Sequence, residues 1–281
     1  MKKVAVITRT KDRQILLRRA LKSVDQQGFR DFSWVIVNDA GEKKPVDEVA
    51  ALAKQSGIDV HVIHRSESKG MEAATNAGIH ASNSEYLSIH DDDDSWHPDF
   101  LNRMVAFLDA DSLFAGVVCH SEEVTEEIKG NKVVENSRKP MNAEIHDIHI
   151  SELFYRNLFP PISLLYRREV LCQTGLYDEA LPVLGDWDFN LRLILHGDIA
   201  VLEERLAFYH VRKSLNHAPN SIHSKPHLHK RYEAVIRNRL IRSGIRDSSL
   251  HPSVIMALAS FGRSKRGVSI TTNKEKPWIF L

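Results

Sequence analysis

Short apolar runs alternate with helical patterns over the N-terminal third of the chain, and this alternation constrains the fold more than any other feature. The apolar runs lie at residues 4–8, 34–37, 60–63 and 86–89. The segments between them repeat apolar or small residues with the spacing of a helix. Strands that alternate with helices predict a parallel sheet with helices on both faces. We therefore expect an α/β fold.

The second half of the chain has a less regular pattern. Apolar runs there are interrupted by polar segments, and a Gly130-Asn131 turn joins two polar arms. The expected elements are strands at residues 115–119, 162–166, 199–202 and 206–211, a hairpin at 123–135, and helices at 186–196 and 226–243.

Charge is divided unevenly along the chain, although the formal net charge is only +1. Residues 205–281 hold 15 basic and 3 acidic side chains, so residues 1–204 carry the acidic excess. With 42% hydrophobic and 27% charged residues, the chain is neither a disordered polymer nor a membrane bundle. Its two cysteines cannot form a disulfide framework and favour a reducing compartment. We expect a cytoplasmic protein.

Four consecutive aspartates, residues 91–94, directly follow the fourth predicted strand. In an open α/β sheet, ligands bind at the carboxyl ends of the parallel strands. Thr8 and Arg9 follow the first strand and Asp39 follows the second, so these residues are expected at the same edge. The sequence thus predicts a polar ligand site there.

The aspartate run itself needs a counter-charge. A divalent cation on a diphosphate is a natural one, because Mg²⁺ prefers one or two carboxylates plus phosphate oxygens. In extended backbone Asp91 and Asp93 share a side and can face one ligand. The alternative is a solvated acidic loop in which Asp94 or Ser95 caps the next helix.

Several short motifs follow one another in an order that is typical of one enzyme family. They are Val4-Ala5-Val6-Ile7-Thr8-Arg9-Thr10, Val35-Ile36-Val37-Asn38-Asp39, Lys69-Gly70 with Ala73-Ala74-Thr75-Asn76-Ala77-Gly78-Ile79, the run from Tyr86 to Pro98, Gly175-Leu176-Tyr177-Asp178-Glu179, and Gly185-Asp186-Trp187-Asp188. Over residues 3–212 the chain resembles the family 2 glycosyltransferases, which are inverting enzymes with the GT-A nucleotide-sugar-binding fold and a D-x-D motif.

Three positions depart from the family pattern. His90 stands where an aliphatic residue usually precedes the D-x-D motif, and Thr75 stands where the small-residue helix usually has arginine. Gly185-Asp186 replaces the common Glu-Asp pair, so one acid of that pair remains. These departures bear on the contacts with the sugar donor.

The resemblance implies a domain organisation. Residues 1–215 would form the glycosyltransferase domain, with a mostly parallel central sheet and helices on both faces. Residues 1–98 would be its nucleotide-binding half and residues 99–215 its acceptor and catalytic half. Residues 216–281 would be a basic helical C-terminal extension.

The resemblance also implies which residues bind the donor. Asp39 and the Thr8-Arg9 turn would contact the nucleoside, and Asp91 would face the ribose or the metal. Asp39 is otherwise a turn residue, Arg9 a surface ion-pair partner, and Lys69 a solvated side chain. The implied donor-binding residues are Thr8, Arg9, Asp39, Lys69, Asp91 and Asp92.

A metal site is implied at the same edge. Asp93 would be the principal ligand of Mn²⁺ or Mg²⁺, together with Asp91, and the ion would neutralise the leaving nucleoside diphosphate. Related enzymes often add a histidine from the region after the last core strand, and His210 is the best match, with His217 as the alternative. A core or solvated histidine is the other interpretation of His210.

Asp186 is the candidate catalytic base. Inversion is a single displacement, in which a carboxylate must lie within hydrogen-bond reach of the attacking acceptor hydroxyl. Asp188, two residues further on, would point elsewhere on a helix. The alternative for Asp186 is a simple helix N-cap.

The predicted function is metal-dependent, inverting transfer of a hexosyl or N-acetylhexosaminyl group. The donor would be a nucleotide-diphosphate sugar, with a UDP-sugar favoured, and the acceptor a hydroxyl of a glycan or lipid-linked molecule in surface polysaccharide synthesis. A non-catalytic nucleotide- or glycan-binding module is one alternative. A sugar nucleotidyltransferase is another, although residues 4–12 lack the glycines of its phosphate loop.

The basic C-terminal region has three interpretations. Its predicted helix could pack on the acidic block, or it could meet anionic lipid or a lipid-diphosphate acceptor at the inner membrane face. Nucleic-acid binding is disfavoured, because no aromatic residues are interleaved with the basic ones.

Overall fold

A computed structural model describes most of the chain. The chain divides into two compact units, Met1–Ala234 and Val235–Leu281. The sheet and its covering helices belong to the first unit, and the helix α9 (Pro226–Arg246) runs across the division. The domain boundary that we expect at residue 215 falls outside the described part and stays a prediction. The described residues are 1–130, 132–212 and 226–246.

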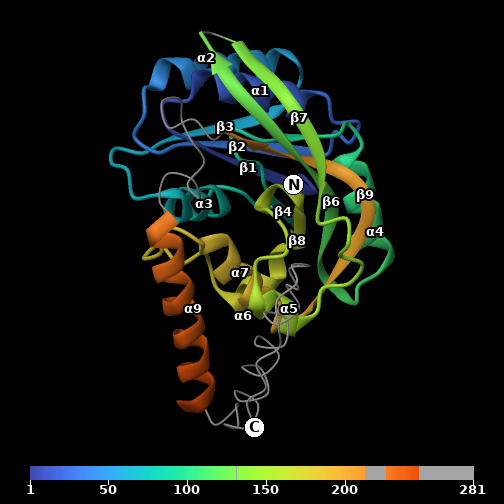
Figure 1. Ribbon diagram of the computed structural model, residues 1–281. Coiled ribbons are helices and arrows are strands. Elements are labelled where there is room, and N and C mark those ends of the chain that lie inside the picture. Colours follow the sequence, from blue (N-terminus) through green and yellow to red (C-terminus); the bar gives the residue numbers. More distant parts are fainter. Residues whose placement is uncertain (131, 213–225, 247–281) are drawn as a thin grey trace, which may run out of the picture. The chain divides into compact units, whose positions relative to one another are not determined.

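Among the described residues, one mixed sheet of nine strands forms the centre of the first unit. Its strands in chain order are β1 (Val4–Thr10), β2 (Phe32–Asn38), β3 (Asp59–His64), β4 (Tyr86–Ile89), β5 (Ser95–Trp96), β6 (Phe114–Lys129), β7 (Lys132–Met141), β8 (Leu164–Arg167) and β9 (Asp198–Val211). Their spatial order is β3-β2-β1-β4-β8-β6-β9-β5, with β7 paired to β6 (Figure 1). Strands β3, β2, β1 and β4 are mutually parallel, as are β6 and β9.

Helices cover this sheet on both faces. They are α1 (Gln14–Asp25), α2 (Lys43–Gln55), α3 (Met71–His80), α4 (Phe100–Ala110), α5 (Ile150–Tyr155), α6 (Leu171–Thr174) and α7 (Gly185–Ile194), with short 3₁₀ turns at Pro161–Ser163 and Arg168–Val170. Val4 and Trp34 of the sheet pack with Leu17 of α1, Val49 of α2 and Met104 of α4 in one buried cluster. Helix α3 lies on the opposite side of β1 and β2 from α1 and α2 (Figure 1). The expected α/β fold is confirmed.

Helix α3 approaches the sheet closely because it carries small residues. A Cβ atom on Gly78 would lie 2.5 Å from Ile7 Cγ2 and 3.4 Å from Val37 Cγ2. Ala73 and Ala74, on the same helix, are also buried. This close packing holds the first turn of α3 beside the carboxyl end of β1.

Later strands differ from the sequence expectation. The two strands expected at 199–202 and 206–211 are one continuous strand, β9, which pairs with β6 in parallel. Residues 203–205 between them are polar because they stay partly exposed on the strand, and not because the strand ends there. Register shifts on either side of His120 bend the pair.

None of the helices in the described ranges combines the length and the apolar character that crossing a bilayer requires.

Candidate active site

The strand register brings the aspartate run beside the end of β1. Ile7 of β1 pairs with Ile89 of β4, and the His90 N–H donates to the Ile7 carbonyl oxygen over 2.9 Å. The residues that follow Ile89 therefore run next to Arg9 and Thr10. This is the carboxyl edge of the parallel strands, where the sequence places the ligand site.

Two of the four aspartates are paired with side chains from the end of β1 and the start of α1. Arg9 donates through Nε and Nη2 to Asp91 Oδ1 over 2.9 and 2.5 Å. Asp92 accepts from Thr10 Oγ1 over 2.7 Å and from Arg13 Nη1 over 3.1 Å. Arginine thus supplies part of the counter-charge that the aspartate run needs.

Asp93 is held by two guanidinium groups, that of Arg13 again and that of Arg212. Arg13 Nη1 donates to its Oδ2 over 3.2 Å, and Arg212 Nη2 donates to the same oxygen. Burial raises the pKa of Asp93, but Arg13 and Arg212 more than offset it, so the pKa lies below its ordinary value. Asp93 is therefore ionised at neutral pH.

Asp94 faces the interior. Its Oδ1 accepts from the His210 backbone N–H over 2.8 Å, and its buried Oδ2 has no hydrogen-bond partner among the described residues. Burial raises the pKa of Asp94 well above its ordinary value, and Asp93 adds to this effect. The alternative in which Asp94 or Ser95 caps a helix is wrong: Ser95 lies in β5, and α4 begins at Phe100.

Behind the aspartates lies a buried cluster around Glu126 of β6. Glu126 accepts from Arg19 Nη1 over 2.5 Å, from Arg212 Nη1 over 2.5 Å and from His210 Nδ1 over 2.6 Å. Burial raises the pKa of Glu126, but His210 and Arg19 reverse this and bring the pKa to about 2. His210 Nε2 pairs with Ser95 Oγ over 2.8 Å.

These contacts bear on the expected metal site. Asp91 Oδ2 and Asp93 Oδ1 take no part in the ion pairs described above, and their side chains are 21% and 11% exposed. Two carboxylates suit a hard cation whose remaining ligands are phosphate oxygens. Across the described ranges, however, no three His, Cys, Asp or Glu side chains are grouped closely enough to hold a metal ion by themselves. His210 has both ring nitrogens in other hydrogen bonds, and His217 lies outside the described residues.

Asp39 binds the loop before α3. Its carboxylate accepts from Arg65 Nη1 over 2.8 Å and from Ser68 Oγ over 2.6 Å. The backbone N–H groups of Lys69 and Gly70 donate to it over 3.3 and 3.2 Å. Asp39 therefore fixes the entry to α3, and its contact with a nucleoside stays a prediction.

Two candidate donor-binding side chains lie away from the aspartates. Thr8 is fully buried, and its Oγ1 accepts from Trp34 Nε1 over 2.8 Å. Lys69 is exposed, and its Nζ lies 2.6 Å from Glu67 Oε1. Thr10, which the sequence analysis did not single out, is the residue of β1 whose hydroxyl reaches the aspartate run.

Asp186 lies in the first turn of α7. The N-cap is Leu184, in the left-handed conformation with φ 63°, so the N-cap interpretation of Asp186 is not supported. Asn157 Nδ2 donates to Asp186 Oδ2 over 2.8 Å. Burial raises the pKa of Asp186; the charge of Arg9 lowers this pKa and the charge of Asp91 raises it further.

The neighbours of Asp186 have structural roles. Asp188 is buried and accepts from Arg192 Nη2 over 2.8 Å, as its helix spacing predicts. Trp187 is buried and donates from Nε1 to the Leu153 carbonyl oxygen over 2.8 Å. Trp187 is thus a core aromatic residue, and Asp186 is the acid of this segment whose pKa the charge of Arg9 lowers.

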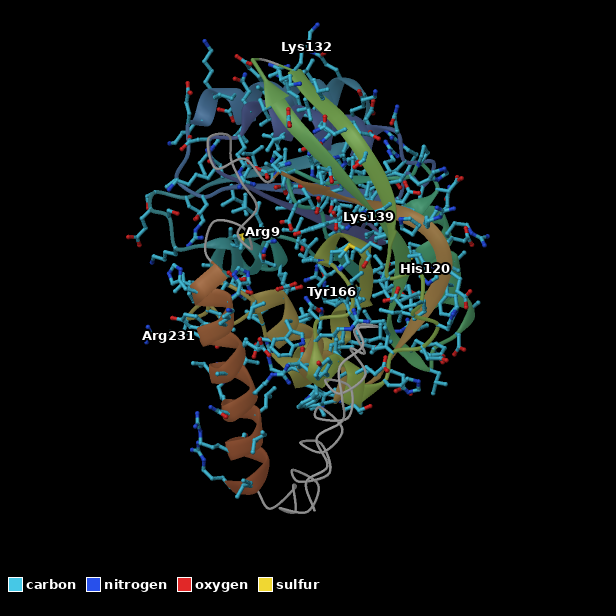
Figure 2. The ribbon with its side chains drawn as sticks, in the orientation of Figure 1. Arg9, His120, Lys132, Lys139, Tyr166 and Arg231 are labelled. Carbon is cyan, nitrogen blue, oxygen red and sulfur yellow. The ribbon has the colours of Figure 1, made fainter. Side chains whose placement is uncertain are left out.

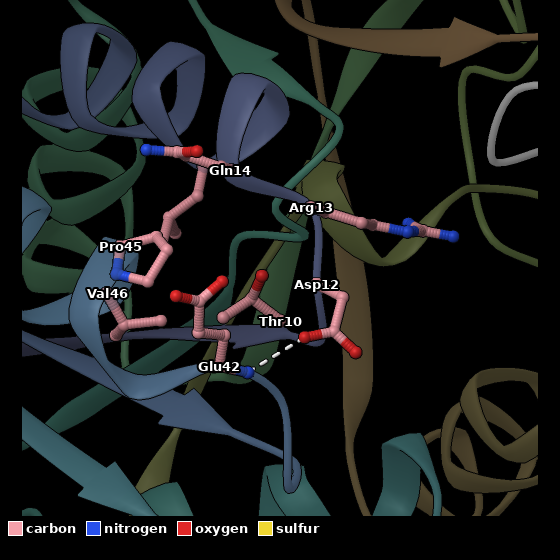
Figure 3. A pocket seen from close by; sticks show the side chains of 8 residues that line it. Thr10, Asp12, Arg13, Gln14, Glu42, Pro45 and Val46 are labelled. Atoms are coloured by element: carbon pink, nitrogen blue, oxygen red, sulfur yellow. Dashed lines mark hydrogen bonds between the residues drawn. The ribbon is translucent and has the colours of Figure 1, made fainter.

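Arg9 joins α3 to the site. Figure 2 shows Arg9 over α3, and its Nη1 donates to Thr75 Oγ1 of that helix over 3.2 Å. A pocket of about 150 Å³ lies beside the β1–α1 turn and is lined in part by Thr10, Arg13 and Glu42 (Figure 3). Asp12 closes its rim by accepting from the Glu42 N–H over 2.8 Å.

Sequence reasoning missed most of the cations. Arg13, Arg19 and Arg212 were not singled out, nor was Glu126. The only available signal was Arg212, which lies two residues after His210 and so on the same side of an extended strand. Arg13 directly precedes α1 and Arg19 lies in it, so only the packing of α1 brings them to the aspartates.

Comparison with known proteins agrees with this geometry. A family model described as glycosyl transferase family 2 matches residues 5–170, more than half of the chain. An uncharacterized glycosyltransferase, YwdF, from Bacillus subtilis is 28% identical over 192 residues, which cover 68% of this chain and 67% of that protein. A PGL/p-HBAD biosynthesis glycosyltransferase from Mycobacterium tuberculosis is 25% identical over 189 residues, covering 67% of this chain and 68% of that one.

Solved structures share the fold. S. aureus TarS 1-349 in complex with UDP-GlcNAc has a TM-score of 0.62 and 18% identity, covering 75% of this chain and 59% of that one. The mannosyltransferase PcManGT from Pyrobaculum calidifontis, in complex with GDP-Man and Mn²⁺, has a TM-score of 0.60 and 16% identity, covering 92% and 79%. The chain thus spans about three fifths of the TarS chain and about two thirds of the bacterial relative YwdF. These likenesses confirm the expected GT-A fold, and with the family match they show that the chain belongs to glycosyl transferase family 2.

Proposed function

We propose that this protein transfers a hexosyl or N-acetylhexosaminyl group, with inversion, from a nucleotide-diphosphate sugar to an acceptor hydroxyl. One observation carries the proposal: the partly buried carboxyl group of Asp186 lies within electrostatic reach of Arg9 and Asp91, which follow the parallel strands at their carboxyl edge. The acid of α7 and the acids after β4 thus act on the pKa of one another. The family relatives and the donor-bound neighbours support a nucleotide-sugar donor.

Asp186 would be the base in this reaction. The acceptor oxygen attacks the anomeric carbon as the bond to the diphosphate breaks, and the carboxylate takes the hydroxyl proton. Burial raises the pKa of Asp186, which makes its carboxylate a stronger base than an exposed aspartate. The hydrogen bond from Asn157 to Oδ2 fixes the orientation of the carboxylate.

The donor end would be held by the other acids and their arginines. Asp91 and Asp93 would hold Mn²⁺ or Mg²⁺ together with the diphosphate oxygens; when bound, such an ion neutralises the charge on the leaving group. Arg9 and Arg13 orient the two carboxylates from the β1–α1 side. Asp39 remains the candidate for contact with the nucleoside, Asp91 is also the candidate for contact with the ribose, and Asp92 remains among the candidate donor-binding residues.

The acceptor belongs to the same proposal. We infer a glycan or lipid-linked acceptor of surface polysaccharide synthesis, handled in the cytoplasm or at the inner membrane face. One relative is named for PGL/p-HBAD biosynthesis, which supports a biosynthetic role for the transfer. Helix α9 is rich in basic residues, including Lys230, Arg231 and Arg237, and a cationic surface suits anionic lipid.

A thermal-shift screen tests the donor. UDP-, GDP-, dTDP- and CMP-sugars are each added with and without Mn²⁺, because a ligand that binds only the folded state raises the melting temperature. We expect the largest shift with a UDP-sugar plus Mn²⁺, followed by release of the nucleoside diphosphate from that donor. If no donor shifts the melting temperature, the proposal fails. Binding without any turnover, across a panel of acceptors, would leave a binding module in its place.

A further inference from the structure

Glu72 is a buried acid whose position the proposed reaction does not yet explain. It lies in the first turn of α3 and is only 4% exposed. Burial raises its pKa to about 7; Arg9 opposes this shift, while Asp186 and Asp91 add to it. Glu72 therefore lies in the electrostatic field of the same three residues that form the candidate site.

Its side chain fills the space in front of Gly185. A Cβ atom built on Gly185 would lie 2.5 Å from Glu72 Cδ, closer than real Cβ contacts, and the carboxylate oxygen Oε1 is in the way as well. Gly185 does not have positive φ, so its backbone is open to any residue. A side chain at position 185 would therefore have to displace the Glu72 carboxyl group from this space.

The two sides of this contact belong to different parts of the site. Gly185 begins α7 and directly precedes Asp186, whereas Glu72 lies one turn before Thr75, whose hydroxyl receives Arg9. Arg9 thus meets Asp91 through direct hydrogen bonds and Glu72 through space. A change at Glu72 reaches both the turn that presents Asp186 and the cation that orients Asp91.

We propose that Glu72 is a positioning residue of the transfer site: its carboxyl group, supplied from α3 into the space in front of Gly185, fixes the turn that carries Asp186 and adds a charge that acts on Arg9 through space. This inference rests on the proposed function and deepens it. Glu72 does not touch the reacting atoms; it acts through Arg9 and Asp186.

Relocating the carboxylate tests this role. Glu72→Gln keeps the shape and removes the charge, Glu72→Ala removes both, and Glu72→Ala with Gly185→Glu supplies a carboxylate to the same space from the other side. The release of nucleoside diphosphate and the calorimetric affinity for the donor are measured for each. Glu48→Gln, on the exposed face of α2 and paired with Arg18, is the matched control.

We expect Glu72→Gln to lower kcat by about tenfold or more while the donor KM changes by less than about threefold, because orientation for the chemical step is lost and not donor affinity. The double variant should recover much of the kcat that Glu72→Ala loses, whereas Gly185→Glu alone should be impaired by collision with Glu72. Rescue by relocation is a result that a merely structural role would not produce.

Two results overturn the inference while the proposed function stands. In the first, wild type is active and Glu72→Gln has the same kcat. In the second, the double variant folds but has a kcat no higher than that of Glu72→Ala. If Glu72→Gln fails to fold, the comparison of Glu72→Ala with the double variant decides alone. An inactive wild type, with no donor bound, removes the proposed function instead and this inference with it.

Discussion

Replacing Glu126 by glutamine tests the electrostatic account of the site without any assumption about substrate. Glu126 is 2% exposed and accepts hydrogen bonds from Arg19, Arg212 and His210. Glutamine has nearly the same shape but no charge, so both arginines lose a carboxylate in a buried setting. The loss should therefore appear in the free energy of unfolding.

The magnitude follows from the pKa of Glu126, which falls from 4.5 to about 2 in the folded protein. One pKa unit corresponds to about 1.4 kcal/mol, so the charged form contributes about 3 kcal/mol at pH 7. Breaking one side of a buried ion pair costs a similar amount, about 3–5 kcal/mol. Because the folded pKa lies below the unfolded one, this stability is complete above about pH 4.5 and is lost as the pH falls toward 2.

Urea denaturation followed by circular dichroism measures this quantity. At pH 7 we expect Glu126→Gln to be less stable than wild type by about 3 kcal/mol, and the difference should shrink to about 2 kcal/mol at pH 3.5. Glu127→Gln is the control, because Glu127 is about half exposed and its pair with Lys129 should contribute about 1 kcal/mol or less. If Glu126→Gln lowers the free energy of unfolding at pH 7 no more than Glu127→Gln does, the reasoning is refuted.

Three further predictions concern packing, proton transfer and metal. Gly78→Ala should lower the free energy of unfolding by about 1–3 kcal/mol, because the new methyl group meets Ile7; an unchanged urea midpoint would contradict the close packing of α3. The transfer rate should rise with pH through a carboxyl pKa above the ordinary 3.8, since burial raises the pKa of Asp186 and only its ionised form accepts the proton; a rate that is flat from pH 4 to 8 counts against this base. Chelation with EDTA should abolish transfer and added Mn²⁺ should restore it, and full activity in EDTA would remove the metal role of Asp91 and Asp93.

The first half of the sheet was predictable because each strand there is a short apolar run bounded by a helix. Strands β1 to β4 therefore lie where the alternation places them. The later strands are harder to recognise, since β6 and β9 are long, bent by register shifts and partly exposed. Because these strands contain polar residues, the sequence pattern does not show where they begin and end, and only their pairing in the sheet does.

The acids of the site were predictable and their partners were not. Asp91 and Asp93 follow a buried strand, so their position at the edge of the sheet can be predicted from the residues next to them in the sequence. Arg13 and Arg19 lie just before α1 and within it, and Arg212 directly follows β9, so only tertiary packing brings them to the acids. The four aspartates need a counter-charge, and much of it is arginine.

Two departures from the family pattern acquire a structural meaning. The hydroxyl of Thr75, where an arginine is usual, receives Arg9 from β1. Gly185, where an acid is usual, leaves room for Glu72 from α3. In both places the charged side chain comes from a different element: Arg9 comes from β1 and Glu72 from α3. The sequence alone does not reveal this, because the contact is made only in the folded structure.

The central claim is that Asp186 is the base of a sugar transfer, and the rate of donor turnover in Asp186→Asn tests it most directly. Release of the nucleoside diphosphate is measured beside wild type at saturating donor and Mn²⁺, with donor affinity measured by calorimetry on both proteins. We expect binding within about threefold of wild type and a rate lower by about 10²-fold or more, as for the loss of a positioned base. A variant that binds the donor and turns it over at the wild-type rate would contradict the account.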